Sequence, residues 1–267
     1  MRTRTSVTAA VFALIAATLA GCAAAPTGTV DSAVTADPSA PLTELTFLTD
    51  PHSYVGQSTA ILSTDAIPTP DTAPEQSLPA TVSSHDLDGD VPVTVTSTDR
   101  IVAMDLSGSI AATVYGLGLG DSMVGRDIST TFSQAADLPV ITSSGHTVNS
   151  ESILALRPTL VITDGSIGPI DVVLQLREAG IPVVFVETTP SIDGVGELAR
   201  QVSAALGAPA AGEVLAQSLV SGIEAKVSEI ASVVPSGKPL RMMFLYLRGT
   251  SGIYYLFGKE SGADVII

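Results

Sequence analysis

Between residues 100 and 234, short apolar runs alternate with stretches whose apolar residues recur at helical spacing. Residues 100–105, 139–141, 160–163 and 182–186 are examples of the runs, and residues 169–179 form a helical stretch that ends at Gly180. A glycine just past the last helical residue is a common helix stop. Short apolar strands that alternate with helices predict a parallel sheet covered on both faces. The expected fold class is therefore α/β.

The last regular stretches predict a helix over residues 194–206 and a longer one over residues 210–234. A loop containing Pro235 and Pro239 follows, and the apolar run 240–247 then opens a predicted new βα unit. We therefore expect a second α/β lobe to begin there and to be truncated in this chain. The predicted boundaries are 81–208 for the N-terminal lobe, 209–235 for the linking helix and 236–267 for the start of the C-terminal lobe.

The first residues have the pattern of a targeting signal. Arg2 and Arg4 precede an apolar stretch at residues 7–19, which is short for a membrane span and suits a signal-peptide core. It ends in LAGC at residues 19–22, which resembles a bacterial lipobox. The resemblance implies that residues 1–21 are a lipoprotein signal peptide and that Cys22 is lipidated. The alternatives are a transmembrane anchor or an ordinary secretory peptide.

Residues 22–80 are rich in Ala, Pro, Thr and Asp, and the sequence has neither Lys nor Arg between Arg4 and Arg100. Such a segment buries too little apolar surface to offset the entropy lost on ordering. We therefore expect a mostly disordered spacer that holds the folded part away from the membrane. The expected location is the extracellular face of the cytoplasmic membrane, with the lipid on Cys22 as the anchor.

Charge and cysteine content exclude several function classes. The chain has 12 Lys and Arg against 27 Asp and Glu, a formal net charge of −15. Nucleic-acid binding requires a basic surface, so it is not expected. A single cysteine excludes a disulfide scaffold. An enzyme is not expected either, because a Gly-x-Ser-x-Gly elbow and a catalytic cysteine are both missing from the sequence of the folded part.

Residues 98–267 resemble the class III substrate-binding proteins of bacterial ABC transporters for haem, iron–siderophores and cobalamin. The resemblance rests on RIV at residues 100–102 and NSESILALRPTLVI at residues 149–162. Within that family, GRDISTTF at 125–132, SGH at 144–146 and YLR at 246–248 are similar to the haemin-binding lipoproteins of actinobacteria. The resemblance implies two Rossmann-like lobes joined by one long helix, which the predicted helix over residues 210–234 matches. It also implies a monomer that captures haem between the lobes. It also implies delivery to an importer permease with its ATPase, for iron acquisition.

The same resemblance implies that haem b is bound by one histidine of the first lobe and one tyrosine of the second. The matching positions are His146 and Tyr246, with Arg248 as support. Imidazole and phenolate are both known haem-iron ligands, and His146 is the only histidine within residues 98–267, which carry the resemblance. Arg248 lies two residues after Tyr246, so both share one strand face, where a guanidinium favours the ionised phenol.

Four further residues are candidates. Tyr254 and Tyr255 are rival oxygen donors from the next strand, and Arg126 is another candidate haem contact. Glu151 stands in the first turn of a predicted helix capped by Asn149, and the resemblance implies that it faces the permease.

Other binding functions stay open from the residues alone. The alternative within the same transporter class is a ferric-siderophore or cobalamin binding protein. A siderophore already coordinates its iron, so a histidine–tyrosine pair would have no role there. A structural surface protein is a further alternative, since a βα pattern does not require a ligand.

Overall fold

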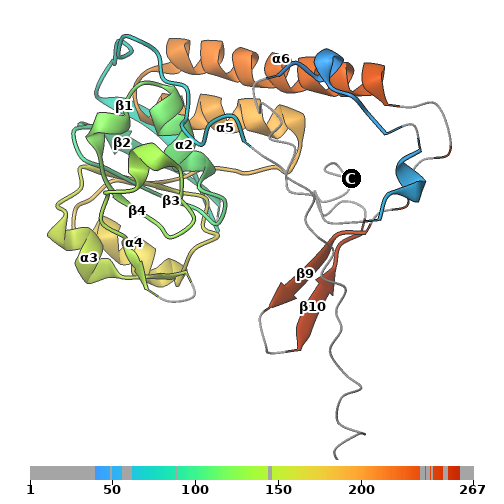
Figure 1. The fold of residues 1–267 in the computed structure, drawn as a ribbon. Coiled ribbons are helices and arrows are strands. Elements are labelled where there is room, and N and C mark those ends of the chain that lie inside the picture. Colours follow the sequence, from blue (N-terminus) through green and yellow to red (C-terminus); the bar gives the residue numbers. More distant parts are fainter. Residues whose placement is uncertain are drawn as a thin grey trace, which may run out of the picture. The chain divides into compact units, whose positions relative to one another are not determined.

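The computed structural model describes residues 40–48, 50–55, 62–87, 89–143, 146–234, 238, 241, 243–248 and 252–258. The chain divides after Ala40 into two units. The second unit, Pro41–Ile267, contains the helices and strands of the described residues (Figure 1). The predicted signal peptide, Cys22 and the first part of the predicted spacer lie outside the described residues. Within the described ranges, no helix is long and apolar enough to cross a membrane.

A four-stranded parallel sheet forms the centre of the lobe. Its strands are β3 (Ile101–Met104), β4 (Met123–Arg126), β7 (Leu160–Thr163) and β8 (Val183–Phe185). They lie in the order β4-β3-β7-β8, and Val102 of β3 pairs with Val161 of β7. Every residue of β3, β7 and β8 is buried, as expected for a parallel sheet with helices on both faces.

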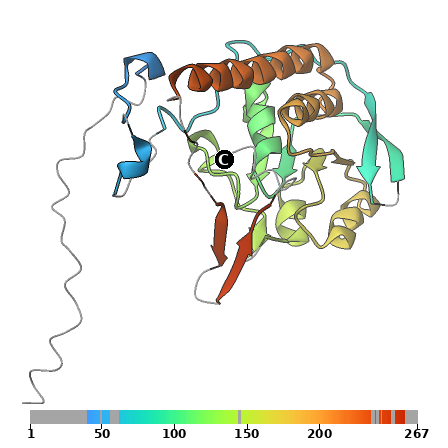
Figure 2. The same cartoon turned by 90° about the vertical axis from the view of Figure 1, so that its right-hand side faces the viewer.

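Helices cover both faces of this sheet (Figures 1 and 2). The covering helices are α2 (Ser109–Gly116) and α5 (Ile192–Ala205) on one face and α3 (Ser150–Ala155) and α4 (Ile170–Glu178) on the other. The long helix α6 (Pro209–Val233) packs on α5. The short 3-10 helices are η1 (Leu42–Glu44), η2 (Pro51–Ser53), η3 (Gly120–Ser122) and η4 (Ser133–Ala135). The predicted long helix over 210–234 is confirmed to within one residue at each end.

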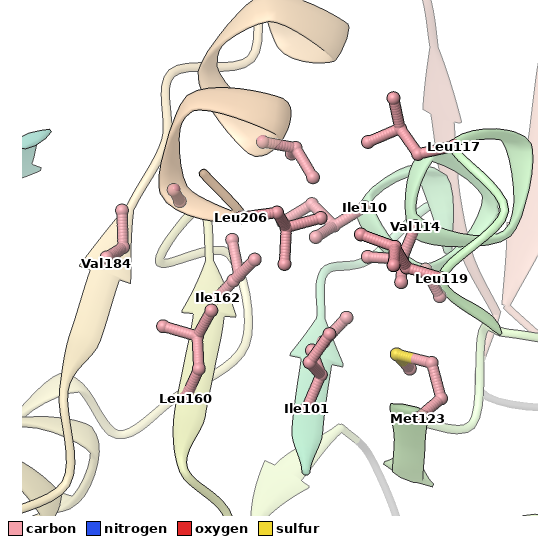
Figure 3. Close-up of a cluster of buried hydrophobic side chains, with 14 of the residues drawn as sticks. Ile101, Ile110, Val114, Leu117, Leu119, Met123, Leu160, Ile162, Val184 and Leu206 are labelled. Atoms are coloured by element: carbon pink, nitrogen blue, oxygen red, sulfur yellow. The ribbon is translucent and has the colours of Figure 1, made fainter. Parts of the chain in front are cut away.

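Alternation along the strands produces two separate cores. Ile101 and Ala103 point to the side of α2 and α5, whereas Val102 and Met104 point to the side of α3 and α4. Figure 3 shows the first core, in which side chains of β3, β7 and β8 meet those of α2 and Leu206. Complete burial on both faces fixes the sheet between its helices, and so fixes where the loops after each strand begin.

Helices α5 and α6 pack closely side by side (Figure 2). Gly212 and Ala216 are the buried residues of α6, and a Cβ added at Gly212 would lie 1.7 Å from the Ser203 hydroxyl oxygen. The missing side chain at Gly212 therefore allows the two helices to approach. An exposed ion pair between Arg200 and Glu213 at 2.7 Å flanks this contact.

A hairpin of β1 (Ala80–Asp86) and β2 (Gly89–Val95) lies against β8. The Ser84 hydroxyl accepts a hydrogen bond from the Phe185 amide at 2.8 Å. Asp86 forms an ion pair with Arg177 of α4, whose guanidinium also donates to the Val183 carbonyl. Burial alone would raise the pKa of Asp86, but hydrogen bonds from Arg177 and Ser84 and the charge of Arg177 hold it below its usual value.

The predicted spacer is wrong at its C-terminal end, because residues 67–78 pack on the lobe. Ile67 and Leu78 contact the first core. The Gln76 side chain donates to the Leu206 carbonyl at 2.8 Å, and the Ser77 amide donates to the Gly207 carbonyl at 2.7 Å. The scattered apolar residues of this segment pack on the surface of the first core. Their irregular spacing gives no sign of this packing in the sequence.

Two further predictions differ from the structure. Residues 139–141, predicted as a strand, contribute a single bridge between Val140 and Arg126. After α6, the predicted opening of a βα unit is an antiparallel hairpin of β9 (Leu245–Arg248) and β10 (Ile253–Leu256). Tyr246 pairs with Tyr255 in that hairpin.

Candidate functional site

The loops that follow the parallel strands lie at one edge of the sheet, and two buried aspartates organise them. Asp105 follows β3 and is fully buried. Its carboxylate accepts hydrogen bonds from the amides of Ser109 at 2.9 Å and Ile110 at 3.2 Å. The N-cap residue of α2 is Gly108, which has no side chain to accept these bonds. The Asp105 carboxylate instead accepts the hydrogen bonds of the first amides of α2.

Asp127 follows β4 and is also fully buried. It accepts hydrogen bonds from the amides of Ser129 at 2.6 Å and Thr130 at 2.9 Å, and from the Asp105 amide at 3.1 Å. Burial raises the pKa of Asp127, and the charge of Asp105 adds to this, while the three amides oppose it. The two loops are therefore joined through the Asp127 carboxylate.

His146 lies in the turn of a short hairpin, formed by β5 (Thr142–Ser143) and β6 (Thr147–Val148). Its backbone φ is +62°, in the left-handed region that disfavours side chains with a Cβ. The ring is partly buried. Its Nδ1 atom is buried and has no hydrogen-bond partner among the described residues.

Hydrogen bonds connect this hairpin to the loops on either side. The Ile128 amide donates to the Thr142 hydroxyl at 3.1 Å. On the other side, the Val148 amide donates to the Gly168 carbonyl at 2.8 Å. His146 is thus held between the loop after β4 and the loop after β7.

One more hydrogen bond joins the loop after β3 to the loop after β7. The Leu106 amide, in the loop after β3, donates to the Ser166 hydroxyl in the loop after β7 at 2.9 Å. We call the loops at residues 105–109, 127–130 and 164–168, together with the β5–β6 hairpin, the loop ring. Binding clefts of open α/β sheets form at this carboxyl edge, so the loop ring is the candidate binding surface of this lobe.

Arg126, a predicted haem contact, is engaged inside the lobe. Its guanidinium donates to the carbonyls of Thr130 at 3.0 Å, Asp127 at 3.3 Å and Ala136 at 3.4 Å. Its Nε atom is buried without a partner among the described residues. In this structure Arg126 therefore supports the backbone of the loop after β4.

The predicted tyrosines lie on the β9–β10 hairpin. The rings of Tyr246 and Tyr255 are 6.0 Å apart, so these two share one face of the hairpin, while Tyr254 points to the other face. Tyr246 is 49% exposed and is not a core tyrosine. The side chain of Arg248 lies outside the described part of the structure. The pairing of His146 with Tyr246 stays a prediction.

Glu151 is the second residue of α3 and is exposed. The predicted cap of this helix is confirmed, because the Asn149 side chain accepts a hydrogen bond from the Ser152 amide at 3.1 Å. No group of three or more His, Cys, Asp or Glu side chains within the described ranges is arranged to hold a metal ion directly.

A family profile described as periplasmic binding protein matches residues 101–267, which is more than half of the chain. The chain belongs to the periplasmic binding protein family. This assignment confirms the predicted α/β class with a parallel sheet and one long helix. It also confirms that this periplasmic binding protein is not an enzyme, because the family and its solved relatives are binding proteins.

Solved structures agree with this assignment. A crystal structure of the haem-binding protein HmuT is 39% identical, with a TM-score of 0.74, over 82% of this chain and 69% of HmuT. The periplasmic haem-binding protein RhuT from Roseiflexus sp. RS-1 is 34% identical, with a TM-score of 0.56, over 64% of this chain and 63% of RhuT. This periplasmic binding protein spans 66–69% of the HmuT chains. No curated protein matches the sequence.

The two buried aspartates and the residues that follow them were not predicted from the sequence. A signal was present, because DLS at residues 105–107 and DIS at 127–129 each follow an apolar strand. In both cases the aspartate is buried and the next residue is exposed, at 50% for Leu106 and 47% for Ile128. This periplasmic binding protein therefore repeats one local arrangement on two neighbouring strands.

Proposed function

We propose that the chain captures haem outside the cytoplasmic membrane and delivers it to the permease of an ABC importer. The transported ligand would be haem b, bound as the monomeric protein's cargo. Cys22 would carry the lipid anchor, and residues 22 to about 66 would be the tether. Glu151, exposed at the start of α3, would be part of the surface that meets the permease.

The observation that carries this proposal is the unfavourable backbone and side-chain environment of His146. Its φ of +62° and its buried Nδ1, which has no partner within the described part of the chain, both cost free energy. Unfavourable features of this kind persist mainly at functional sites, where the surrounding structure holds them in place. Imidazole is a common haem-iron ligand, and the hairpin holds this one at the edge of the sheet where ligands bind.

Tyr246 is the proposed second axial ligand, with Arg248 as its support. HmuT has been solved with alanine in place of one histidine, one tyrosine and one arginine. In those variants the tyrosine and the arginine are two residues apart, as Tyr246 and Arg248 are here. A guanidinium beside a phenol favours the phenolate that binds ferric iron.

Tyr254 and Tyr255 are the alternative oxygen donors. Tyr255 shares the face of Tyr246 and its ring lies 6.0 Å away, so it is the stronger rival. Phenylalanine at each position in turn identifies the ligand, because only loss of the iron-bound oxygen removes the ferric phenolate absorption.

Titration of the chain with haemin, followed by visible absorption, tests the proposal. We expect saturation at one haem per chain, and a shifted Soret band with about tenfold weaker binding in His146→Ala, a change of about 1.4 kcal/mol. His85→Ala is the matched control, because His85 pairs with Asp90 in the β1–β2 hairpin. Equal spectra and affinities in all three proteins would contradict haem ligation by His146. Saturable binding of cobalamin or a ferric siderophore without haemin binding would favour the other transporter substrates.

A further inference from the structure

The loop ring, which includes the hairpin that carries His146, places two large apolar side chains on the surface. Leu106 is 50% exposed and Ile128 is 47% exposed. Each follows a fully buried aspartate, and the Asp105 amide bonds to the Asp127 carboxylate at 3.1 Å. The two apolar residues therefore occupy equivalent positions on adjacent, directly connected loops.

Hydrogen bonds from their backbone amides hold both residues in place. The Leu106 amide bonds to Ser166 at 2.9 Å, and the Ile128 amide bonds to Thr142 at 3.1 Å. Thr142 belongs to the hairpin that carries His146. Hydrogen bonds thus connect the loops that carry Leu106 and Ile128 and the hairpin that carries His146 at this one edge of the sheet.

Apolar side chains that face water are informative here, because exposing them costs free energy that a ligand recovers by covering them. A buried aspartate followed by an exposed apolar residue occurs after both β3 and β4. This repeat indicates that the exposure of Leu106 and Ile128 is a feature of the fold. We propose that Leu106 and Ile128 form an apolar wall on which one face of a flat macrocycle lies, beside the His146 ligand. This inference rests on the proposed haem-binding function and names residues that determine its specificity.

The charges around the wall agree with an apolar contact. Among the described residues of the loop ring and β4, the cation is Arg126, whose guanidinium nitrogens donate to loop carbonyls. Asp164 accepts hydrogen bonds from Ser166 and Thr188. A ligand's carboxylates would find no free cation among these described residues, so its uncharged ring surface is the part that fits this wall.

Metal-free protoporphyrin IX tests the wall separately from iron ligation, since it has the same ring and cannot be bound through iron. We expect Leu106→Ser and Ile128→Ser each to weaken the binding of protoporphyrin IX and of haemin about tenfold. His146→Ala should weaken only haemin. Leu154→Ser is the matched control, because Leu154 is 43% exposed on α3, outside the loop ring. Thermal unfolding of each variant checks that the fold is kept.

The outcomes separate the wall from the proposed function. If both serine variants bind protoporphyrin IX and haemin as tightly as the unchanged protein, the wall is wrong while haem binding stands. If Leu154→Ser weakens binding as much as they do, the wall has no special role. If the unchanged protein binds no haemin, the proposed function fails and this inference fails with it.

Discussion

The backbone amide of Asp105 donates a hydrogen bond of 3.1 Å to the carboxylate of Asp127. This contact joins the ends of β3 and β4 and places two fully buried acids side by side. A buried carboxylate needs donors in place of the water that it has lost, and here backbone amides provide them. The stability of the loop ring therefore depends on Asp127 as much as on the residues that face outward.

Replacing Asp127 tests this dependence. Asp127→Ala leaves the amides of Asp105, Ser129 and Thr130 without acceptors, so we expect a loss of roughly 3 kcal/mol in the free energy of unfolding. Asp127→Asn should cost less, because the amide keeps one oxygen and removes a buried charge. Urea unfolding of both variants measures this order. Equal losses would show that the hydrogen bonds to Asp127 do not carry the stability.

The pKa of Asp86 predicts how the lobe responds to acid. Arg177 and Ser84 hold the pKa of Asp86 below its usual value, so the pair stabilises the fold fully above the unfolded pKa of about 3.9. That stabilisation is lost as the pH falls through the lower, folded pKa. We expect the free energy of unfolding to fall more steeply below about pH 4 in the unchanged protein than in Asp86→Asn.

Measuring the free energy of unfolding from neutral pH down through the acid range checks this expectation. Arg177→Met serves as a second probe, because it removes the charge that lowers the pKa of Asp86. Parallel pH profiles for the unchanged protein and Asp86→Asn would contradict the proposed linkage.

The close approach of α5 and α6 makes a prediction about Gly212. A Cβ at this position would lie 1.7 Å from the Ser203 hydroxyl oxygen and 3.2 Å from the Ala199 carbonyl oxygen. Gly212→Ala should therefore destabilise the lobe by about 1–3 kcal/mol through overpacking. The loss should be smaller in a Ser203→Gly background, because the two positions are in contact.

Gly222 supplies the control on the same helix. No described atom lies within 4 Å of a Cβ added there. Gly222→Ala should raise the free energy of unfolding by about 0.5–1 kcal/mol, since alanine favours a helix over glycine. Destabilisation by both alanine variants would assign the effect to the helix itself rather than to its contact with α5.

The strain at His146 can be measured without any ligand. Both His146→Gly and His146→Ala remove the imidazole, but only glycine accepts a φ of +62° without a steric cost. We expect the glycine variant to be about 1 kcal/mol more stable than the alanine variant. Chemical denaturation of the two proteins provides the comparison, and equal stability would show that the turn relaxes when the side chain changes.

The elements that the sequence predicts well are those that its local pattern determines. Strands β3 and β7 are continuous apolar runs because both of their faces are buried. The long helix α6 begins at Pro209, a residue suited to the first turn. The cap at Asn149 was predictable for the same reason, since the side chain and the amide that it accepts are three residues apart.

The rest depends on contacts between distant residues. The loop ring closes through Leu106 with Ser166 and Ile128 with Thr142, pairs that no local pattern indicates. The packing of Ile67 on the lobe was missed because prolines interrupt any period around it. His146 was identified by its resemblance to a family motif. Its backbone strain, and a ring nitrogen left without a partner by the residues that the structure describes, were visible only in the structure.

The loop ring separates the parts that hold it together from the parts that face outward. Its connections use backbone amides, two buried carboxylates and small hydroxyls, whereas Leu106 and Ile128 face solvent through their side chains. Substitutions at these two positions leave every connecting group in place. Such a surface can change its cargo by single mutations during evolution while the frame keeps its shape, so related chains with this frame need not carry the same molecule.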